Sequence, residues 1–271
     1  LAPLLGGQLL LFWAWPSLFI VLGVAGIGGL LLAQLALKES LLKEHRAEFS
    51  LSAVGRNYWN ILSHRKAMAC ILAHGFFFSG MFAFITASPF VYIELLGVSE
   101  QSYGVFFALN IIALALCNLL NMRLMNRFRE ISLLRYGNLV SALAAIIMVV
   151  NVQTGFGGLW GVVIPVMIYI GSMGFSGPNA NALALSFFPK TAGTANATAG
   201  VLRFGLGGIM SAMVALLHNG TALPMAGVMA FCGVMAVLSL HVLGRELFTP
   251  EVNTYNPADE HLPPQVEKKA A

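Results

Sequence analysis

Long apolar stretches separated by short polar connections dominate the chain. A helix needs about 20 apolar residues to cross the hydrocarbon core of a bilayer, and most of these stretches reach that length. The pattern predicts full membrane helices at 17–37, 67–95, 101–122, 132–152, 158–183, 192–217 and 222–244. Residues 1–12 are also apolar, and we expect them to be the second half of a further membrane helix whose beginning is missing from the chain.

Two longer polar segments interrupt this pattern. Residues 38–66 are rich in charged side chains and predict a basic linker between membrane helices. Residues 245–271 carry four prolines and few apolar residues, which predicts a solvated, mostly disordered tail. The chain is thus expected to divide into 1–37, the linker, a six-helix bundle at 67–244 and the tail.

The basic residues follow the same alternation. Of the 15 lysines and arginines, all but Arg203 lie in alternate connections or in the tail, and the remaining connections hold none. Basic residues collect on the cytoplasmic side of membrane proteins. The linker and the tail are therefore predicted to be cytoplasmic.

Composition excludes several classes of protein. The chain is 58% hydrophobic and 10% charged, whereas a soluble domain carries about 25% charged residues. We therefore expect an integral, multi-pass membrane protein. No basic stripe suited to nucleic acid is present, the three cysteines stand singly inside apolar spans, and the only aspartate is Asp259. These features predict no enzymatic site, no cofactor and no metal site.

The span at 67–89 is unusually rich in phenylalanine. Helical periodicity places Phe77, Met81 and Phe84 on one face and Phe78 and Phe82 on another, so only part of the cluster can line a cavity. The rings are either packing residues or one wall of a drug pocket. His74, on the same span, is typical of a hydrogen-bonded packing residue.

Arg203 is the one arginine deep inside a predicted span, since Arg135 lies only three residues from the beginning of its own. It lies eleven residues after Ala192, or about 16 Å into the helix. A bare cation there costs about 2.5–3.5 kcal/mol or more, so the side chain needs a polar partner. It either contacts substrate or biases proton movement in a central cavity, or it clamps carbonyls of the 158–183 helix.

Other polar and helix-breaking residues inside the spans are candidates for the same cavity. Asn110 and Asn118 are either interhelical contacts or lining residues of the path, and Asn181, after Gly177 and Pro178, is a candidate lining residue. Glu94, at the outer end of its helix, is either a solvated helix-end carboxylate or a gating or coupling residue. The remaining candidates shape or pack helices: Pro89, Gly174, Gly177 and Pro178.

Several stretches are similar to one transporter family. Residues 2–7, with Pro3, Gly6 and Gly7, resemble the end of the antiporter motif of drug–proton antiporters. Residues 88–94, 103–110, 188–195 and 200–205 resemble the Bcr/CflA drug-resistance transporters of the major facilitator superfamily, in the expected order.

The resemblance implies an all-α membrane fold of twelve helices. This chain would hold the C-terminal six-helix bundle plus the last one and a half helices of the N-terminal bundle. It also implies a bacterial inner-membrane antiporter that exports lipophilic drugs, of the bicyclomycin or sulfonamide type, in exchange for protons by alternating access. The family's proton-carrying acidic residue would lie on the missing N-terminal helices, which would be this chain's partners.

Other functions stay open at this point. The same fold also serves metabolite symporters and facilitators, and only the Pro3, Gly6 and Gly7 remnant favours export. A chain without its remaining helices is expected to transport nothing by itself, because half of the cavity is absent.

Overall fold

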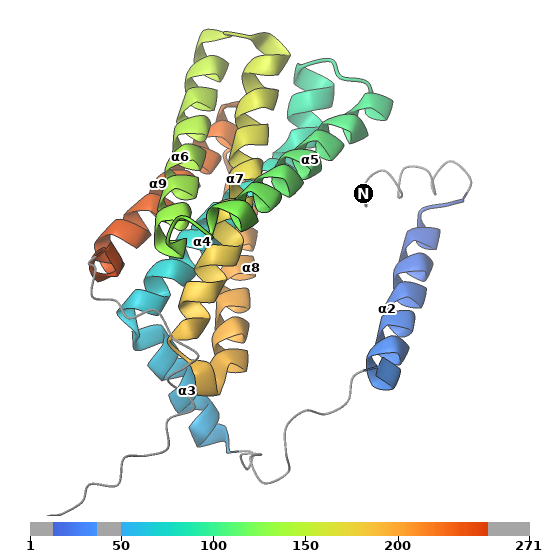
Figure 1. Cartoon of the computed structure of the whole chain (residues 1–271). Coiled ribbons are helices and arrows are strands. Elements are labelled where there is room, and N and C mark those ends of the chain that lie inside the picture. Colours follow the sequence, from blue (N-terminus) through green and yellow to red (C-terminus); the bar gives the residue numbers. More distant parts are fainter. Residues whose placement is uncertain (1–12, 37–49, 249–271) are drawn as a thin grey trace, which may run out of the picture.

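The computed structural model describes residues 13–36 and 50–248, and this part of the chain is helical without strands (Figure 1). The α-helices are α2 (Pro16–Ala36), α3 (Leu51–Ser63), α4 (Arg65–Pro89), α5 (Glu100–Leu124), α6 (Glu130–Thr154), α7 (Gly158–Ser186), α8 (Ala192–Leu216) and α9 (Leu223–Leu243). Among the described residues, seven helices are long and apolar enough to cross a membrane. They agree with the predicted spans to within three residues at every end. The predicted half helix at 1–12 lies outside the described residues.

The two polar segments contain more structure than their composition indicates. In the predicted linker, Leu51–Ser63 form the amphipathic helix α3, which buries Ile61 and exposes Trp59. In the predicted tail, Arg245–Phe248 form a 3-10 turn and Leu247 is buried. The folded part of the chain therefore runs past 245, because one apolar side chain of the turn packs back onto the bundle. Residues 37–49 and 249–271 lie outside the described residues.

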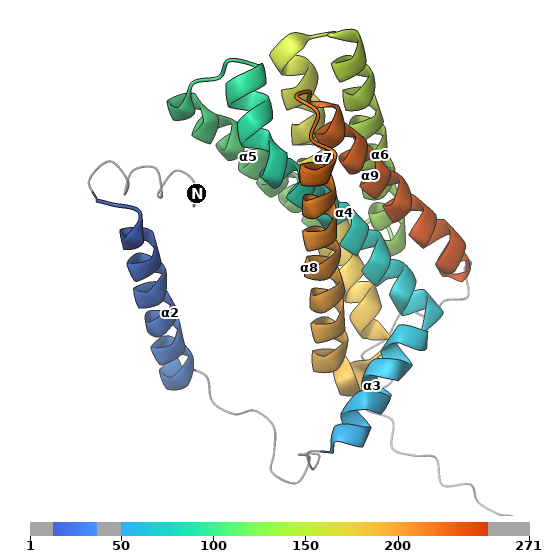
Figure 2. The ribbon, with the colours of Figure 1, turned by 180° about the vertical axis from the view of Figure 1, so that it is seen from behind.

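Helix α4 is the central element of the bundle. It packs along α7, α8 and α9, while α6 contacts α7 and α9, and α5 contacts α7. Figures 1 and 2 show these six helices together and α2 standing apart from them. No residue of α2 is buried. The assignment of α2 to an N-terminal bundle stays a prediction.

Aromatic side chains fill the core between α4 and α7. Phe77 and Tyr169 are completely buried and meet edge to face, with ring centroids 4.8 Å apart. The Tyr169 hydroxyl donates a hydrogen bond of 3.0 Å to the backbone carbonyl of Phe77. A buried phenol needs such a partner, because hydrocarbon offers none. The pair fixes the height at which the two helices meet.

The end of α4 departs from ordinary helix geometry. Pro89 has no backbone N–H to continue the α-helical ladder, and the next six residues, Phe90–Leu95, form a π-helix. Ser88 is held there by a 2.7 Å hydrogen bond with the Tyr103 hydroxyl of α5. The predicted span 67–95 is therefore continuous, but its last turns are wider than an α-helix.

The first and last helices of the bundle are joined at one end. Arg65 donates a hydrogen bond of 3.0 Å to the carbonyl of Val242, and the Lys66 ammonium lies 3.0 Å from a carboxylate oxygen of Glu246. His64 caps α4 and packs on Phe187, 4.8 Å between ring centroids. These contacts place 64–66, the end of α7 and the end of α9 on one side, as the charge pattern predicts.

Helices α5 and α7 meet at Gly174. A Cβ atom there would lie 2.6 Å from the backbone nitrogen of Asn118 and 2.8 Å from the carbonyl carbon of Cys117. Both atoms belong to the backbone of α5, so a rotamer change cannot relieve the overlap. Only glycine permits this approach, which is the use of small residues expected in membrane helix packing.

We expect Gly174→Ala to destabilise the bundle by about 1–3 kcal/mol, the usual effect of overpacking a tight contact. Thermal unfolding of the purified protein in detergent measures it. Gly208→Ala is the matched control, because a Cβ atom at Gly208 meets nothing within 4 Å. Equal midpoints for the two variants would contradict the close approach.

Candidate functional site

Arg203 lies in the middle of α8 and is partly buried. Its Nη2 donates a hydrogen bond of 3.2 Å to Oδ1 of Asn181 on α7. Its guanidinium carbon lies 5.6 Å from the ring centroid of Phe78 on α4. One arginine thus connects three helices through an amide oxygen and an aromatic face, both of which stabilise a cation.

A group of aromatic rings continues this surface. Phe78 packs on Phe82 at 5.2 Å and on Phe204 of α8 at 5.4 Å between centroids, and Phe82 lies 6.1 Å from Phe204. Phe204 is 60% exposed. We call Arg203, Asn181 and these three phenylalanines the Arg203 platform.

Small and hydroxyl residues hold α4 against α8 below the platform. Gly207 lies under the Phe82 ring, whose nearest atom would be 3.2 Å from a Cβ at that position. Thr86 donates a 3.0 Å hydrogen bond to the Ser211 hydroxyl, which lies 3.4 Å from the carbonyl of Phe82. These contacts fix the register of the two helices that carry the aromatic rings.

His74 lies beside the platform and packs between helices. It is 6% exposed, its Nδ1 lies 3.5 Å from the Ser176 hydroxyl, and its ring covers Gly177. These contacts fit the expected packing role. Pro178 follows without ending α7. Among the described residues, no group of three His, Cys, Asp or Glu side chains could hold a metal ion.

A second polar contact joins α5 to α7. The Asn179 amide donates a 2.8 Å hydrogen bond to Oδ1 of Asn121 and a 2.7 Å bond to the carbonyl of Phe175. Both asparagines are buried. Because lipid cannot satisfy these amides, their pairing favours the interpretation of Asn121 as an interhelical contact, whereas the buried Asn110 side chain has no such partner among the described residues.

The platform carries positive charge without a neighbouring carboxylate. Within 13–36 and 50–248, the carboxylates are Glu94, Glu100, Glu130 and Glu246, and each lies at or beyond a helix end. An anionic or strongly polar group that approaches Arg203 therefore meets no competing acid from these residues. The arrangement suits an oxygen acceptor beside a flat apolar ring.

The other predicted cavity residues lie elsewhere. Phe77 is completely buried in the α4–α7 core, about 100° around α4 from Phe78. Met81 and Asn110 line a separate small cavity of about 190 Å³ between α4, α5 and α7. Asn118 lies at the tight α5–α7 crossing, and Glu94 is exposed at the end of the π-helix.

Three contributors were absent from the predicted set: Phe204, Thr86 and Ser211. The sequence contained a signal for two of them. Phe204, Gly207 and Ser211 follow one another at helical spacing on α8, which predicts a single face with a large, a small and a hydroxyl residue. Only the packing of α4 on α8 identifies Thr86 as the partner of Ser211.

Comparison with known proteins assigns the fold to a family. The sequence pattern described as Major Facilitator Superfamily matches residues 1–212. The chain belongs to this superfamily. It is 31% identical to a bicyclomycin resistance protein homolog of Haemophilus influenzae over 242 residues, which are 89% of this chain and 61% of that protein. This match confirms the expected Bcr/CflA type.

Two further relatives are named as transporters. An uncharacterized MFS-type transporter of Bacillus subtilis, YdgK, is 32% identical over 90% of this chain and 61% of its own length. The multidrug transporter MdfA of Edwardsiella ictaluri is 31% identical over 104 residues, 38% of this chain and 25% of its own. The chain thus spans about three fifths of the length of the first two relatives.

These matches, together with the seven apolar helices, establish an all-α, multi-pass integral membrane protein of the Major Facilitator Superfamily. They point to a transporter and not to an enzyme. All three relatives are bacterial, in agreement with the expected inner-membrane location.

The Asn121–Asn179 contact generates a prediction that does not depend on transport. Asn121→Ala and Asn179→Ala are each expected to destabilise the bundle, and a double-mutant cycle is expected to give a coupling of about 0.6–1.7 kcal/mol. Unfolding of the purified protein in mixed micelles measures the cycle. The control cycle pairs Asn151→Ala with Asn121→Ala. The Asn151 side chain, near the end of α6, donates a hydrogen bond to the Gly161 carbonyl of α7 and makes no contact with Asn121, so this cycle should show no coupling.

Proposed function

We propose that residues 67–244 form the C-terminal six-helix bundle of a secondary exporter, and that residues 1–37 are the end of its N-terminal bundle. The exporter moves lipophilic drugs outward in exchange for protons by alternating access of the two bundles. Residues 38–66 form the cytoplasmic linker between them. The Arg203 platform is the part of this bundle that meets the substrate near the membrane midplane, where transporters of this architecture bind their cargo.

The observation that carries the proposal is the position of Arg203. It lies deep in a membrane helix, beside partly exposed aromatic rings and without a carboxylate partner among the described residues. A charge inside a membrane span costs free energy, and in most membrane proteins such residues have a function. Its hydrogen bond to Asn181 orients the guanidinium without neutralising it.

The platform favours a particular class of substrate. Phe78, Phe82 and Phe204 offer edges and faces to a flat apolar molecule, and such contacts demand little of its shape. The guanidinium can donate hydrogen bonds to a carbonyl, sulfonyl or anionic oxygen of that molecule. Sulfonamide-like drugs have this combination of sulfonyl oxygens and a flat ring, and the names of two relatives, for bicyclomycin resistance and for multidrug transport, agree with a drug as the substrate.

Coupling to protons requires a group that titrates along the path. Since the carboxylates of 13–36 and 50–248 all lie at or beyond helix ends, away from the middle of the spans, we expect that group on another helix, one that packs against the Arg203 platform. Arg203 would respond to its charge, because a carboxylate that loses its proton attracts the guanidinium. Glu94 stays the second coupling candidate, at the outer end of the path.

A metabolite symporter or facilitator of the same fold is the alternative. Inverted membrane vesicles with an imposed pH gradient separate the two. The exporter accumulates a labelled drug only when the interior is acidic, and the accumulation collapses with a protonophore. Uptake that ignores the gradient indicates a facilitator, and uptake only when the exterior is acidic, with protons entering together with the substrate, indicates a symporter. The chain is assayed alone and joined to an N-terminal bundle, since one bundle encloses only half of a cavity.

Arg203→Ala is expected to reduce drug export about ten- to hundredfold, the cost of losing a charged hydrogen bond in the transport cycle. Arg203→Lys keeps the charge but not the planar donor geometry, and we expect an intermediate rate. Arg56→Ala on the exposed side of α3 is the control. Vesicle transport, corrected for protein in the membrane, gives the rates. Wild-type export by Arg203→Ala would refute the proposed role.

Glu94→Gln is expected to leave both the rate and its pH profile unchanged, because the exposed carboxylate lies at the helix end and water solvates it already. The same vesicle assay, run across pH values, measures this. A shift of the profile in this variant would instead assign Glu94 to gating or proton coupling.

A further inference from the structure

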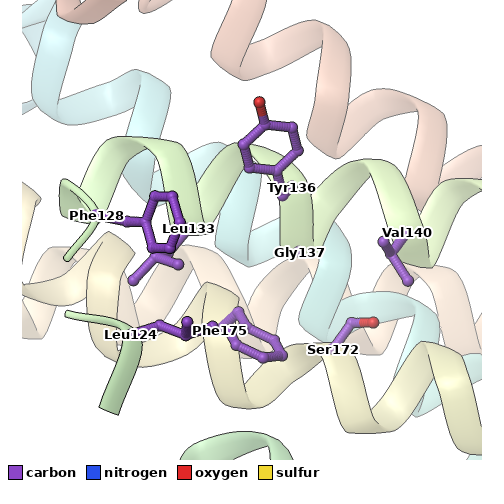
Figure 3. Close-up of a pocket in the computed structure, with 8 residues that line it drawn as sticks. All are labelled: Leu124, Phe128, Leu133, Tyr136, Gly137, Val140, Ser172 and Phe175. Carbon is purple, nitrogen blue, oxygen red and sulfur yellow. The ribbon is translucent and has the colours of Figure 1, made fainter. Parts of the chain in front are cut away.

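A groove of about 460 Å³ opens on the side of the bundle between α5 and α6 (Figure 3). Both helices pack on α7 but scarcely on each other, so α7 forms the floor of the groove. Gly137 brings α6 close to this floor, since a Cβ there would lie 2.9 Å from Cβ of Phe175. The groove lies apart from the Arg203 platform and shares no residue with it.

The lining of the groove is suited to hydrocarbon. Leu124, Phe128 and Val140 contribute apolar side chains, and the two hydroxyl groups are those of Tyr136 and Ser172. The Ser172 hydroxyl donates to the carbonyl of Ile168 at 2.7 Å, and the Tyr136 hydroxyl points away from Phe175 in Figure 3. These walls therefore offer a polar solute few partners, whereas an acyl chain needs none.

One end of the groove is positively charged. Leu124 and Phe128 line that end, and Arg123, Arg127 and Arg129 are their direct neighbours in sequence. The three arginines are exposed, with Glu130 as the single acid of the turn. The charge pattern places this turn on the cytoplasmic side, where anionic headgroups attract juxtamembrane arginines.

We propose that this groove binds an anionic phospholipid of the cytoplasmic leaflet. One acyl chain lies between α5 and α6 on the floor of α7, and the phosphate contacts the arginines of the α5–α6 turn. The positive-inside rule explains why arginines occur on this side, but it does not explain an apolar groove that ends among them. Lipid binding of this kind is independent of the proposed drug export.

Native mass spectrometry of the purified protein tests the proposal. The protein is titrated with phosphatidylglycerol, with phosphatidylcholine of the same acyl chains, and with glycerol phosphate as the headgroup alone. We expect phosphatidylglycerol to bind at least tenfold more tightly than phosphatidylcholine, and glycerol phosphate not to compete. Equal affinity of the two lipids would overturn the proposal, and so would competition by glycerol phosphate. This comparison needs no variant.

Two variants locate the site. The double variant Arg127→Gln/Arg129→Gln is expected to lower the affinity for phosphatidylglycerol about 10- to 25-fold, at roughly fivefold per arginine. Its affinity for phosphatidylcholine should be unchanged. Val140→Phe fills the groove without changing any charge, and it should also lower the affinity for phosphatidylglycerol. Lys190→Gln removes an exposed basic residue of the same side, at the α7–α8 connection away from the groove, and should change nothing. Wild-type affinity in either test variant, or an equal loss in Lys190→Gln, would contradict the assignment.

Discussion

The absence of water from the bilayer core is the constraint on which this structure depends. A polar group inside a span is stabilised by a partner in the protein, since lipid offers none. Asn179 finds Asn121, Tyr169 finds the Phe77 carbonyl, and Arg203 finds Asn181 and a ring. Each of these contacts crosses from one helix to another. These polar contacts therefore help to fix which helices meet and at what height, together with close apolar approaches such as the one at Gly174.

Helix α4 shows how one element serves packing and function together. Its buried face meets α7 and α9 through Phe77 and Gly80, and its other face presents Phe78 and Phe82 to α8. Consecutive residues of a helix point about 100° apart, so Phe77 packs in the core while its neighbour Phe78 belongs to the platform. The rings of the platform can remain partly exposed because the rings behind them anchor the helix.

The sequence was sufficient for the spans, their order and the family, because hydropathy and basic residues reflect the bilayer directly. It was sufficient to single out Arg203 as a charge deep in a membrane helix, whose role in transport stays a prediction. It was not sufficient to select the cavity residues. Periodicity separates the faces of α4 but does not say which face is covered, so Phe77 entered the candidate set beside Phe78. The amphipathic α3 and the turn at Leu247 were missed because a few apolar residues within polar segments carry little weight in any average.

The ties at residues 65–66 have a topological consequence. Arg65 and Lys66 join the beginning of the bundle to Val242 and Glu246 at its end. The first and last helices of the bundle are therefore neighbours, and α4 and α9 also pack along each other. A circularly permuted bundle, opened at an outer turn and rejoined across this pair, would retain every native helix neighbour.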